Sequence, residues 1–242
     1  KGCWRKPAEM RRIAVRSLEP DPGNAGVGMR PYRFVSALRR LRGPRCGYFL
    51  KKEKKHMKVS KTRMICEAAI FIAMAEILSL IKLYEFPNGG SITLEMLPII
   101  LFAARYGCGW GAGAGLVYGA STYLIGNKFS IDWTTIICDY FLAFVALGFG
   151  AGLLSRRKWS VYYGTLIGGV LRFLVHYLIG VFVWGVYMPD EFFGMTMTSP
   201  WFYSLLYNGS YMLPSIILCV VVFALLYKPL KKYFTSADLL AA

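Results

Sequence analysis

After residue 60, the chain is a succession of apolar segments, each about as long as the hydrocarbon core of a membrane is thick. A helix of roughly 20 apolar residues spans a core of about 30 Å. A soluble domain could bury one such segment, but hardly six. The sequence therefore predicts an all-α polytopic membrane protein, a bundle of six transmembrane helices. The predicted spans are residues 63–83, 93–106, 108–126, 133–155, 161–187 and 201–228.

Charges in the connections predict how this bundle is oriented, because Lys and Arg concentrate in cytoplasmic loops. Alternate connections are basic, and they contain Lys58, Lys61, Arg63, Arg105, Arg156, Arg157, Lys158, Lys228, Lys231 and Lys232. The intervening connections are neutral to acidic, with Glu85, Lys128, Asp132, Asp190 and Glu191. The alternation predicts that both termini are cytoplasmic in a multi-pass protein of the bacterial plasma membrane.

The formal charge of +16 would suggest a nucleic-acid partner if it were spread over the chain. Residues 1–56 hold 16 Lys/Arg and 4 Asp/Glu, or +12, whereas residues 57–242 hold 13 and 9, or +4. Because the basic excess belongs to the N-terminal stretch, we predict no nucleic-acid partner.

The sequence lacks the motifs of the commonest enzyme classes. It contains no GxxxxGK[ST] for ATP, no HExxH and no GxSxG, and its two histidines are His56 and His176. We therefore do not expect metal-site or catalytic-triad chemistry, and we predict no metal or cofactor.

Polar residues at membrane depth are expensive and normally face a cavity or a partner. The informative ones are Asp139, Arg172 and His176. Glu67, Glu76 and Glu95 also lie within or near spans, and for Glu67 and Glu95 a snorkelling or capping role is an equal interpretation.

The fifth and sixth predicted spans carry aromatic side chains at helical spacing. His176, Gly180 and Trp184 are four residues apart, so they share one helix face, and Gly180 would leave room for a flat ligand. The alternative is a buried, satisfied histidine with a tryptophan at the membrane interface. In the sixth span Tyr203, Tyr207 and Tyr211 share a face, and Tyr203 and Asn208 could meet one ligand by flanking it.

The fourth predicted span contains Asp139 followed by Tyr140. One buried carboxylate with several aromatic rings suits a flat organic cation, which is attracted by the charge and by cation–π contacts.

Small residues in three spans predict close helix packing, since glycine and alanine let backbones approach in lipid. They are Gly107, Gly109, Gly111, Gly113 and Gly115, then Gly148, Gly150 and Gly152, and the pair Ala69 and Ala73.

Four motifs together resemble the thiamine-specific S components of energy-coupling-factor (ECF) transporters, the ThiT/YuaJ family. They are PNGGSITLEMLP (87–98), CDYFLAF (138–144), LRFLVHYLIGVFVWG (171–185) and YSLLYNGSYMLPS (203–215). The resemblance runs from about Met57 to Phe234 and implies a six-helix bundle that binds thiamine near its extracellular side, capped by the loop after the first span. The ligand-binding residues that it implies are Asp139, Tyr140, His176, Trp184, Tyr203 and Asn208.

The resemblance also implies that the chain is not an enzyme and that it works with partner subunits. Ala69 and Ala73 would dock on the transmembrane T subunit, and two ABC ATPases would supply the energy for transport. The carboxylate in this chain is Asp139, where members of the family often have Glu, and Gly89, Gly90 and Ser91 occupy the region where some members have a tryptophan.

Three segments are expected along the chain. Residues 1–56 have no apolar signal core and no periodicity, so we expect a non-native or disordered extension, with translation starting near Met57. The run 18–28 is compatible with translation of a thiamine-pyrophosphate riboswitch leader. Residues 57–234 would form the membrane substrate-binding domain, and 235–242 a C-terminal tail.

Other functions stay open at this stage. The nearest alternative is an S component for riboflavin, another vitamin or a pyrimidine precursor, which would not need a carboxylate opposite aromatic rings. An intramembrane transferase would need a cluster of metal-binding carboxylates, and a channel would need a lined conduction path.

Overall fold

The computed structural model describes residues 60–87, 89–125, 130–157 and 159–240. Contacts between backbone positions group Met57–Ala242 as one compact unit. The predicted N-terminal extension, the start at Met57 and the charges Lys58, Lys128 and Lys158 lie outside the described residues.

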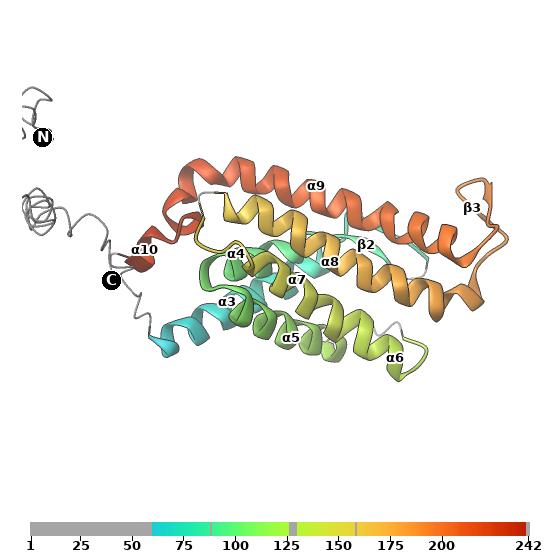
Figure 1. Ribbon diagram of the computed structural model, residues 1–242, viewed down its shortest axis with the longest axis horizontal. Helices are drawn as coiled ribbons and strands as arrows, with labels where there is room; N and C mark the ends of the chain where they lie inside the picture. The colour runs from blue at the N-terminus through green and yellow to red at the C-terminus, as the bar shows by residue number, and fades with distance from the viewer. Residues whose placement is uncertain (1–59, 88, 126–129, 158, 241–242) are drawn as a thin grey trace, which may run out of the picture. The chain divides into compact units, whose positions relative to one another are not determined.

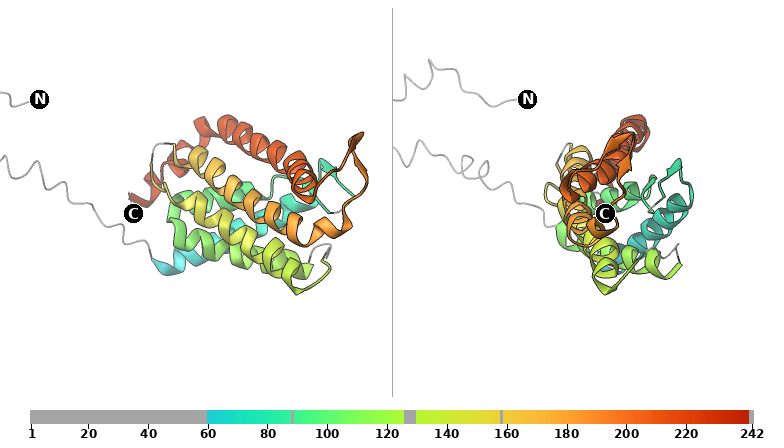
Figure 2. Two further views of the ribbon diagram at one scale, coloured as in Figure 1. Left: turned by 45° about the vertical axis from the view of Figure 1, so that its right-hand side comes forward. Right: turned by 90° about the vertical axis from the view of Figure 1, so that its right-hand side faces the viewer.

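The described chain is mainly helical, and a helix occupies the position of each of the six predicted spans (Figures 1 and 2). The elements are α3 (Lys61–Leu80), α4 (Met96–Tyr106), α5 (Cys108–Ile125), α6 (Trp133–Thr135) with η1 (Ile136–Leu142) and α7 (Ala143–Gly152), α8 (Ser160–Phe182) with η2 (Trp184–Tyr187), α9 (Pro200–Phe234) and α10 (Ala237–Leu240). The all-α membrane class is confirmed.

In the part of the chain that the structure describes, three helical segments are long and apolar enough to cross a membrane: Trp133–Gly152, Ser160–Phe182 and Pro200–Leu239. Met96–Tyr106 is a shorter apolar helix. The count of six spans and the cytoplasmic location of both termini therefore stay predictions.

Two small antiparallel hairpins interrupt the helical pattern. β1 (Tyr84–Glu85) pairs with β2 (Ser91–Ile92), and β3 (Glu191–Phe192) pairs with β4 (Met195–Thr196). Both lie in the half of the bundle away from α10 (Figure 1). We call the hairpin end the outer end and the α10 end the inner end, which is the end predicted to be cytoplasmic.

Close packing of α5 against α7 confirms the role predicted for some of the glycines. A Cβ added to Gly111 would lie 2.4 Å from the carbonyl oxygen of Gly148, and one on Gly115 would lie 2.1 Å from that of Phe144. Gly109 and Gly113 face open space within the described part of the chain, so the packing does not require them to be glycine.

Helices α3 and α4 differ sharply in burial. Every residue of α4 is buried, whereas α3 has one fully buried residue, Ala75. Arg105, expected in a connection, lies in the last turn of α4 with its side chain 2% exposed. α4 is thus a central helix, and α3 lies at the periphery of the bundle.

Candidate functional site

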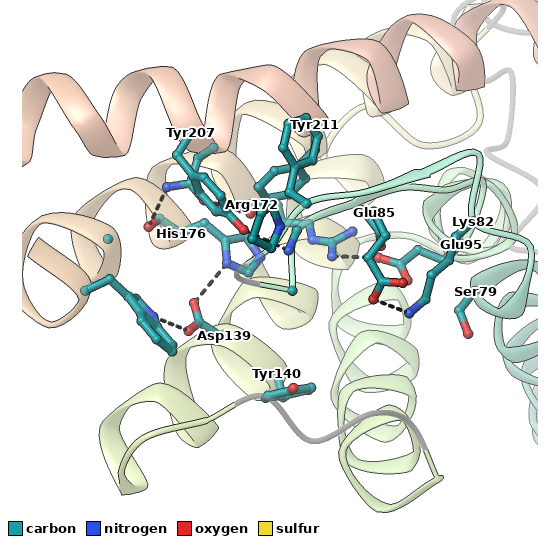
Figure 3. Close-up of a pocket in the computed structure, with 18 of the residues that line it drawn as sticks. Ser79, Lys82, Glu85, Glu95, Asp139, Tyr140, Arg172, His176, Tyr207 and Tyr211 are labelled. Atoms are coloured by element: carbon teal, nitrogen blue, oxygen red, sulfur yellow. Dashed lines mark hydrogen bonds and ion pairs between the residues drawn. The ribbon is translucent and has the colours of Figure 1, made fainter. Parts of the chain in front are cut away.

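A cavity of about 1000 Å³ opens in the outer half of the bundle and brings together all six residues proposed from the sequence (Figure 3). Its walls come from α5, η1, α7, α8, η2 and α9, and the end of α3 with the chain between α3 and α4 contributes to its rim. The six residues are Asp139, Tyr140, His176, Trp184, Tyr203 and Asn208.

Asp139 lies at the centre of a hydrogen-bonded group on one wall (Figure 3). Its Oδ1 is 2.9 Å from Nδ1 of His176, and its Oδ2 accepts a hydrogen bond of 3.3 Å from Nε1 of Trp184. Both Asp139 and Tyr140 belong to the π-helix η1, in which the Ala143 N–H donates to the Cys138 carbonyl. Such wide turns recur at functional sites, and periodicity along a single span did not predict this one.

The structure corrects two details of the helix face proposed for the fifth span. α8 ends at Phe182, so Trp184 is placed by the 3₁₀ turn of η2 rather than by the helix that carries His176. Gly180 does line the cavity, but a Cβ there would lie 2.2 Å from Oγ of Ser204. The absence of a side chain at Gly180 therefore allows α8 to pack closely against α9, and does not serve only to leave room for a ligand.

The tyrosines of α9 do share a face, as their spacing predicted. Ring centroids of Tyr203 and Tyr207, and of Tyr207 and Tyr211, are each 5.7 Å apart. Asn208 lines the same cavity, but its Oδ1 accepts a 2.7 Å hydrogen bond from Tyr211 and its Nδ2 donates at 3.0 Å to the Ser204 carbonyl. The amide of Asn208 is thus already held by the protein.

Two ion pairs in the cavity were not placed in the site by sequence reasoning. Arg172 Nη2 is 2.7 Å from Glu95 Oε1, and Lys82 Nζ is 2.6 Å from Glu85 Oε1. Tyr118 donates to the second oxygen of Glu95 at 3.1 Å. The sequence did contain a signal for the pair of Arg172 and Glu95, because a charged side chain at membrane depth generally pairs with an opposite charge. Which spans face each other could not be predicted from one sequence.

The charges lining the cavity do not cancel. Among the lining residues that the structure describes, three carboxylates (Glu85, Glu95 and Asp139) face two cations (Lys82 and Arg172), so their sum is −1 with His176 counted as neutral. Glu85 and Glu95 are each paired with one of these cations, whereas the described partners of Asp139 are the hydrogen-bond donors of His176 and Trp184. The cavity therefore presents one carboxylate that a cationic ligand can neutralise.

The cavity also contains a buried nitrogen with which a ligand can form a hydrogen bond. Within the described residues, Nε2 of His176 is buried and has no hydrogen-bond partner. A buried nitrogen without a partner costs free energy, so a ligand with a complementary polar group would be favoured there.

The segment between α3 and α4 covers the cavity from the outer side. Phe86 is buried, and the Gly90 N–H donates a 3.0 Å hydrogen bond to the hydroxyl of Tyr207. A Cβ on Gly90 would lie 2.6 Å from the ring of Tyr211, so the backbone sits directly on these tyrosines. Phe86 also meets Phe193 of the second hairpin, with ring centroids 6.2 Å apart.

A helical membrane bundle with a covered, aromatic, net-negative cavity defines a substrate-binding membrane protein. Residues 65–235 match the family described as thiamine transporter protein (Thia_YuaJ). The chain is 33% identical to the thiamine transporter ThiT of Bacillus subtilis (strain 168), covering 67% of this chain and 89% of that protein. It is 28% identical to ThiT of Lacticaseibacillus paracasei, covering 72% and 92%.

A solved structure has the same fold. ThiT from Listeria monocytogenes superimposes with a TM-score of 0.63 at 28% identity, covering 72% of this chain and 98% of that one. The chain therefore belongs to the ThiT/YuaJ family of thiamine transporters, which are multi-pass proteins of the bacterial cell membrane and not enzymes. The family predicted from the four motifs is confirmed.

Proposed function

We propose that this chain is the thiamine-binding S component of an ECF-type importer and that the outer cavity is its thiamine site. Family membership makes the chain a component of thiamine transport. The observation that carries the choice of site is the carboxylate of Asp139, which has no Lys or Arg partner among the described residues and lies in a cavity lined by aromatic rings. Thiamine is a flat cation whose thiazolium charge cannot be lost by deprotonation.

Each proposed contact has a physical role. Asp139 supplies the counter-charge, and Nε2 of His176 is aimed at a polar group of the ligand. Trp184, Tyr140 and Tyr203 supply faces for stacking and cation–π attraction. Asn208 contacts the ligand while its amide, bonded to Tyr211 and Ser204, holds the wall of the cavity in place.

The transport energy would come from partner subunits. The sequence has no P-loop, so ATP hydrolysis is assigned to two ABC ATPases that act through a transmembrane T subunit. Ala69 and Ala73 are exposed on α3, the peripheral helix, and we propose them as the docking face for that subunit. Small side chains permit close approach of a second helix in lipid.

Binding to the purified chain tests this function. Calorimetry with thiamine should give about one site per chain, without ATP hydrolysis, and riboflavin should not bind. Riboflavin binding at one site per chain with no thiamine binding would reject the substrate and favour the alternative of an S component for another vitamin.

A further inference from the structure

At the inner end of the bundle four charged side chains form a closed ring, here called the charge ring: Arg63, Glu67, Arg105 and Asp238. Going round it, the N–O distances are 2.9 Å (Arg63 to Glu67), 3.1 Å (Glu67 to Arg105), 2.8 Å (Arg105 to Asp238) and 3.0 Å (Asp238 to Arg63). Positive and negative groups alternate, so each contacts two opposite charges and the ring is neutral. It joins three elements, α3, α4 and α10.

Two members of the charge ring are buried, which raises the effect of losing either of them on stability. The side chains of Arg105 and Asp238 are 2% and 8% exposed, and Asp238 binds Arg105 through both carboxylate oxygens. Arg105 also donates to the carbonyl of Tyr233 at 2.9 Å. A buried charge that loses its partner is strongly destabilised, whereas an exposed pair contributes little. Asp238 is therefore the residue through which α10 acts on the other helices.

Apolar contacts place α10 against the same two helices. Leu239 is 3% exposed and clusters with Phe102 and Tyr106 of α4. Met64 and Phe71 of α3 pack against this cluster. The C-terminal helix thus fills the space between α3 and α4 at the inner end.

Besides the charge ring and the apolar packing of its inward-facing side, α3 has a polar attachment near its outer end. Its one fully buried residue is Ala75, and near its outer end the carboxylate of Glu76 accepts hydrogen bonds from the hydroxyls of Ser121 and Thr122 on α5. The exposed residues Ala69 and Ala73 lie between Glu67, which belongs to the charge ring, and Glu76. The charge ring and the Glu76 contacts therefore hold α3 on either side of these alanines.

We infer that the charge ring is a positioning device for docking: α10, through Asp238 and Arg105, holds α3 so that Ala69 and Ala73 face a helix of the T subunit. This inference rests on the docking face proposed above. No member of the ring lines the thiamine cavity, so its role is in transport and not in ligand recognition. Arg63 and Asp238 also lie outside residues 65–235, the range that matches the family.

The test compares three full-length variants. Asp238→Asn removes one ring charge while keeping the side-chain shape, and Asp238→Glu keeps the charge. Asp190→Asn removes an exposed carboxylate at the outer end as the matched control. Three quantities are measured for each: thiamine affinity by calorimetry, hydrogen exchange of the peptide covering residues 63–72, and ATP-driven thiamine uptake in vesicles with the partner subunits.

Asp238→Asn should leave the thiamine dissociation constant within about twofold, since the ring is remote from the cavity. Hydrogen exchange in α3 should speed up by at least about tenfold, the factor that 1.4 kcal/mol of local stability represents. Uptake should fall in parallel, Asp238→Glu should recover most of it, and Asp190→Asn should change none of the three quantities.

Normal uptake by Asp238→Asn, or a loss of thiamine affinity with faster exchange in every helix, would overturn the inference. The double variant Ala69→Trp with Ala73→Trp separates this failure from failure of the docking face itself. If the tryptophans block uptake and Asp238→Asn does not, docking is right and the charge ring does not position it. If neither blocks uptake, the docking face is wrong as well.

Discussion

Asp139 and Asp238 both have largely buried carboxylates, but the groups that surround them differ in charge. Asp238 meets two arginines and is fully compensated inside the protein. Asp139 meets an imidazole and an indole N–H, which are donors without a permanent charge. The first carboxylate is suited to holding helices together, and the second to receiving a cation from outside.

The charge of Asp139 should determine thiamine affinity. Asp139→Asn keeps the shape of the side chain and removes the charge, so it should weaken thiamine binding by about 3–5 kcal/mol, or roughly two to four decades in dissociation constant. A neutral deaza analogue should lose much less. Trp184→Ala should cost about 1–3 kcal/mol for thiamine, because cation–π and packing contributions are smaller.

Calorimetry with both ligands separates electrostatic recognition from hydrogen bonding at Asp139. Equal weakening of thiamine and the deaza analogue by Asp139→Asn would show that Asp139 acts through its hydrogen bonds to His176 and Trp184 and not through its charge.

Stability at acidic pH should depend on Asp238, in α10. Burial alone would raise its pKa, but hydrogen bonds and charge from Arg105, with Arg63 adding to them, hold that pKa below the ordinary value of 3.8. Glu67 and Tyr106 face the same site. A lowered pKa means that the ionised carboxylate stabilises the fold above pH 3.8, and that this contribution disappears as the pH falls through the lowered value.

Thermal unfolding of the natural chain and of Asp238→Asn should therefore differ by a constant amount at neutral and mildly acidic pH. The difference should shrink only when the pH falls below 3.8. A difference that already fades near neutral pH would assign the effect to another group.

At the scale of elements, the peripheral helix α3 carries the proposed docking face, and the segment between α3 and α4 covers the cavity. We expect Ala69→Trp with Ala73→Trp to leave thiamine binding intact and abolish uptake, because bulk on this exposed face prevents close helix approach. Calorimetry and vesicle uptake measure the two outcomes. Ile217→Trp, an exposed substitution on α9, is the matched control, and normal uptake by the double variant would count against a docking face.

The segment between α3 and α4 should control how long thiamine stays bound. Tyr207→Phe removes the hydroxyl that accepts from the Gly90 N–H and keeps the ring. A hydrogen bond contributes about 0.5–1.5 kcal/mol, so dissociation of labelled thiamine should speed up about 2- to 10-fold. Tyr84→Phe, which removes an exposed hydroxyl from the same segment, should leave the rate unchanged. Equal rates in all three proteins would show that this hydrogen bond does not hold the cover closed.

At the scale of the whole molecule, the alternation of charge predicts a single orientation. An epitope inserted at Gly194, in the exposed turn of the second hairpin, should be labelled by antibody on intact cells, and a C-terminal epitope should be labelled only after permeabilisation. Labelling of both epitopes on intact cells would contradict six spans with cytoplasmic termini, even though six helical positions are observed.

The sequence by itself determined the helix positions, the family and six of the side chains that meet in the cavity. The apolar length of a span, the charge of a loop and the spacing of residues are properties of a short stretch of sequence. They can therefore be recognised without knowing the fold. Asp139, His176 and Tyr203 were identifiable because polar and aromatic groups at membrane depth need a reason to be there.

Tertiary structure decided which segments face one another. Asp139 lies in a π-helical turn and Trp184 in a 3₁₀ turn, and Gly180 lies at the contact between α8 and α9. The tertiary structure also paired Glu95 with Arg172 and closed the charge ring through Asp238. Residues far apart in the chain become partners only when helices pack at a particular rotation and tilt. Those quantities depend on all the interfaces at once, so no single segment encodes them.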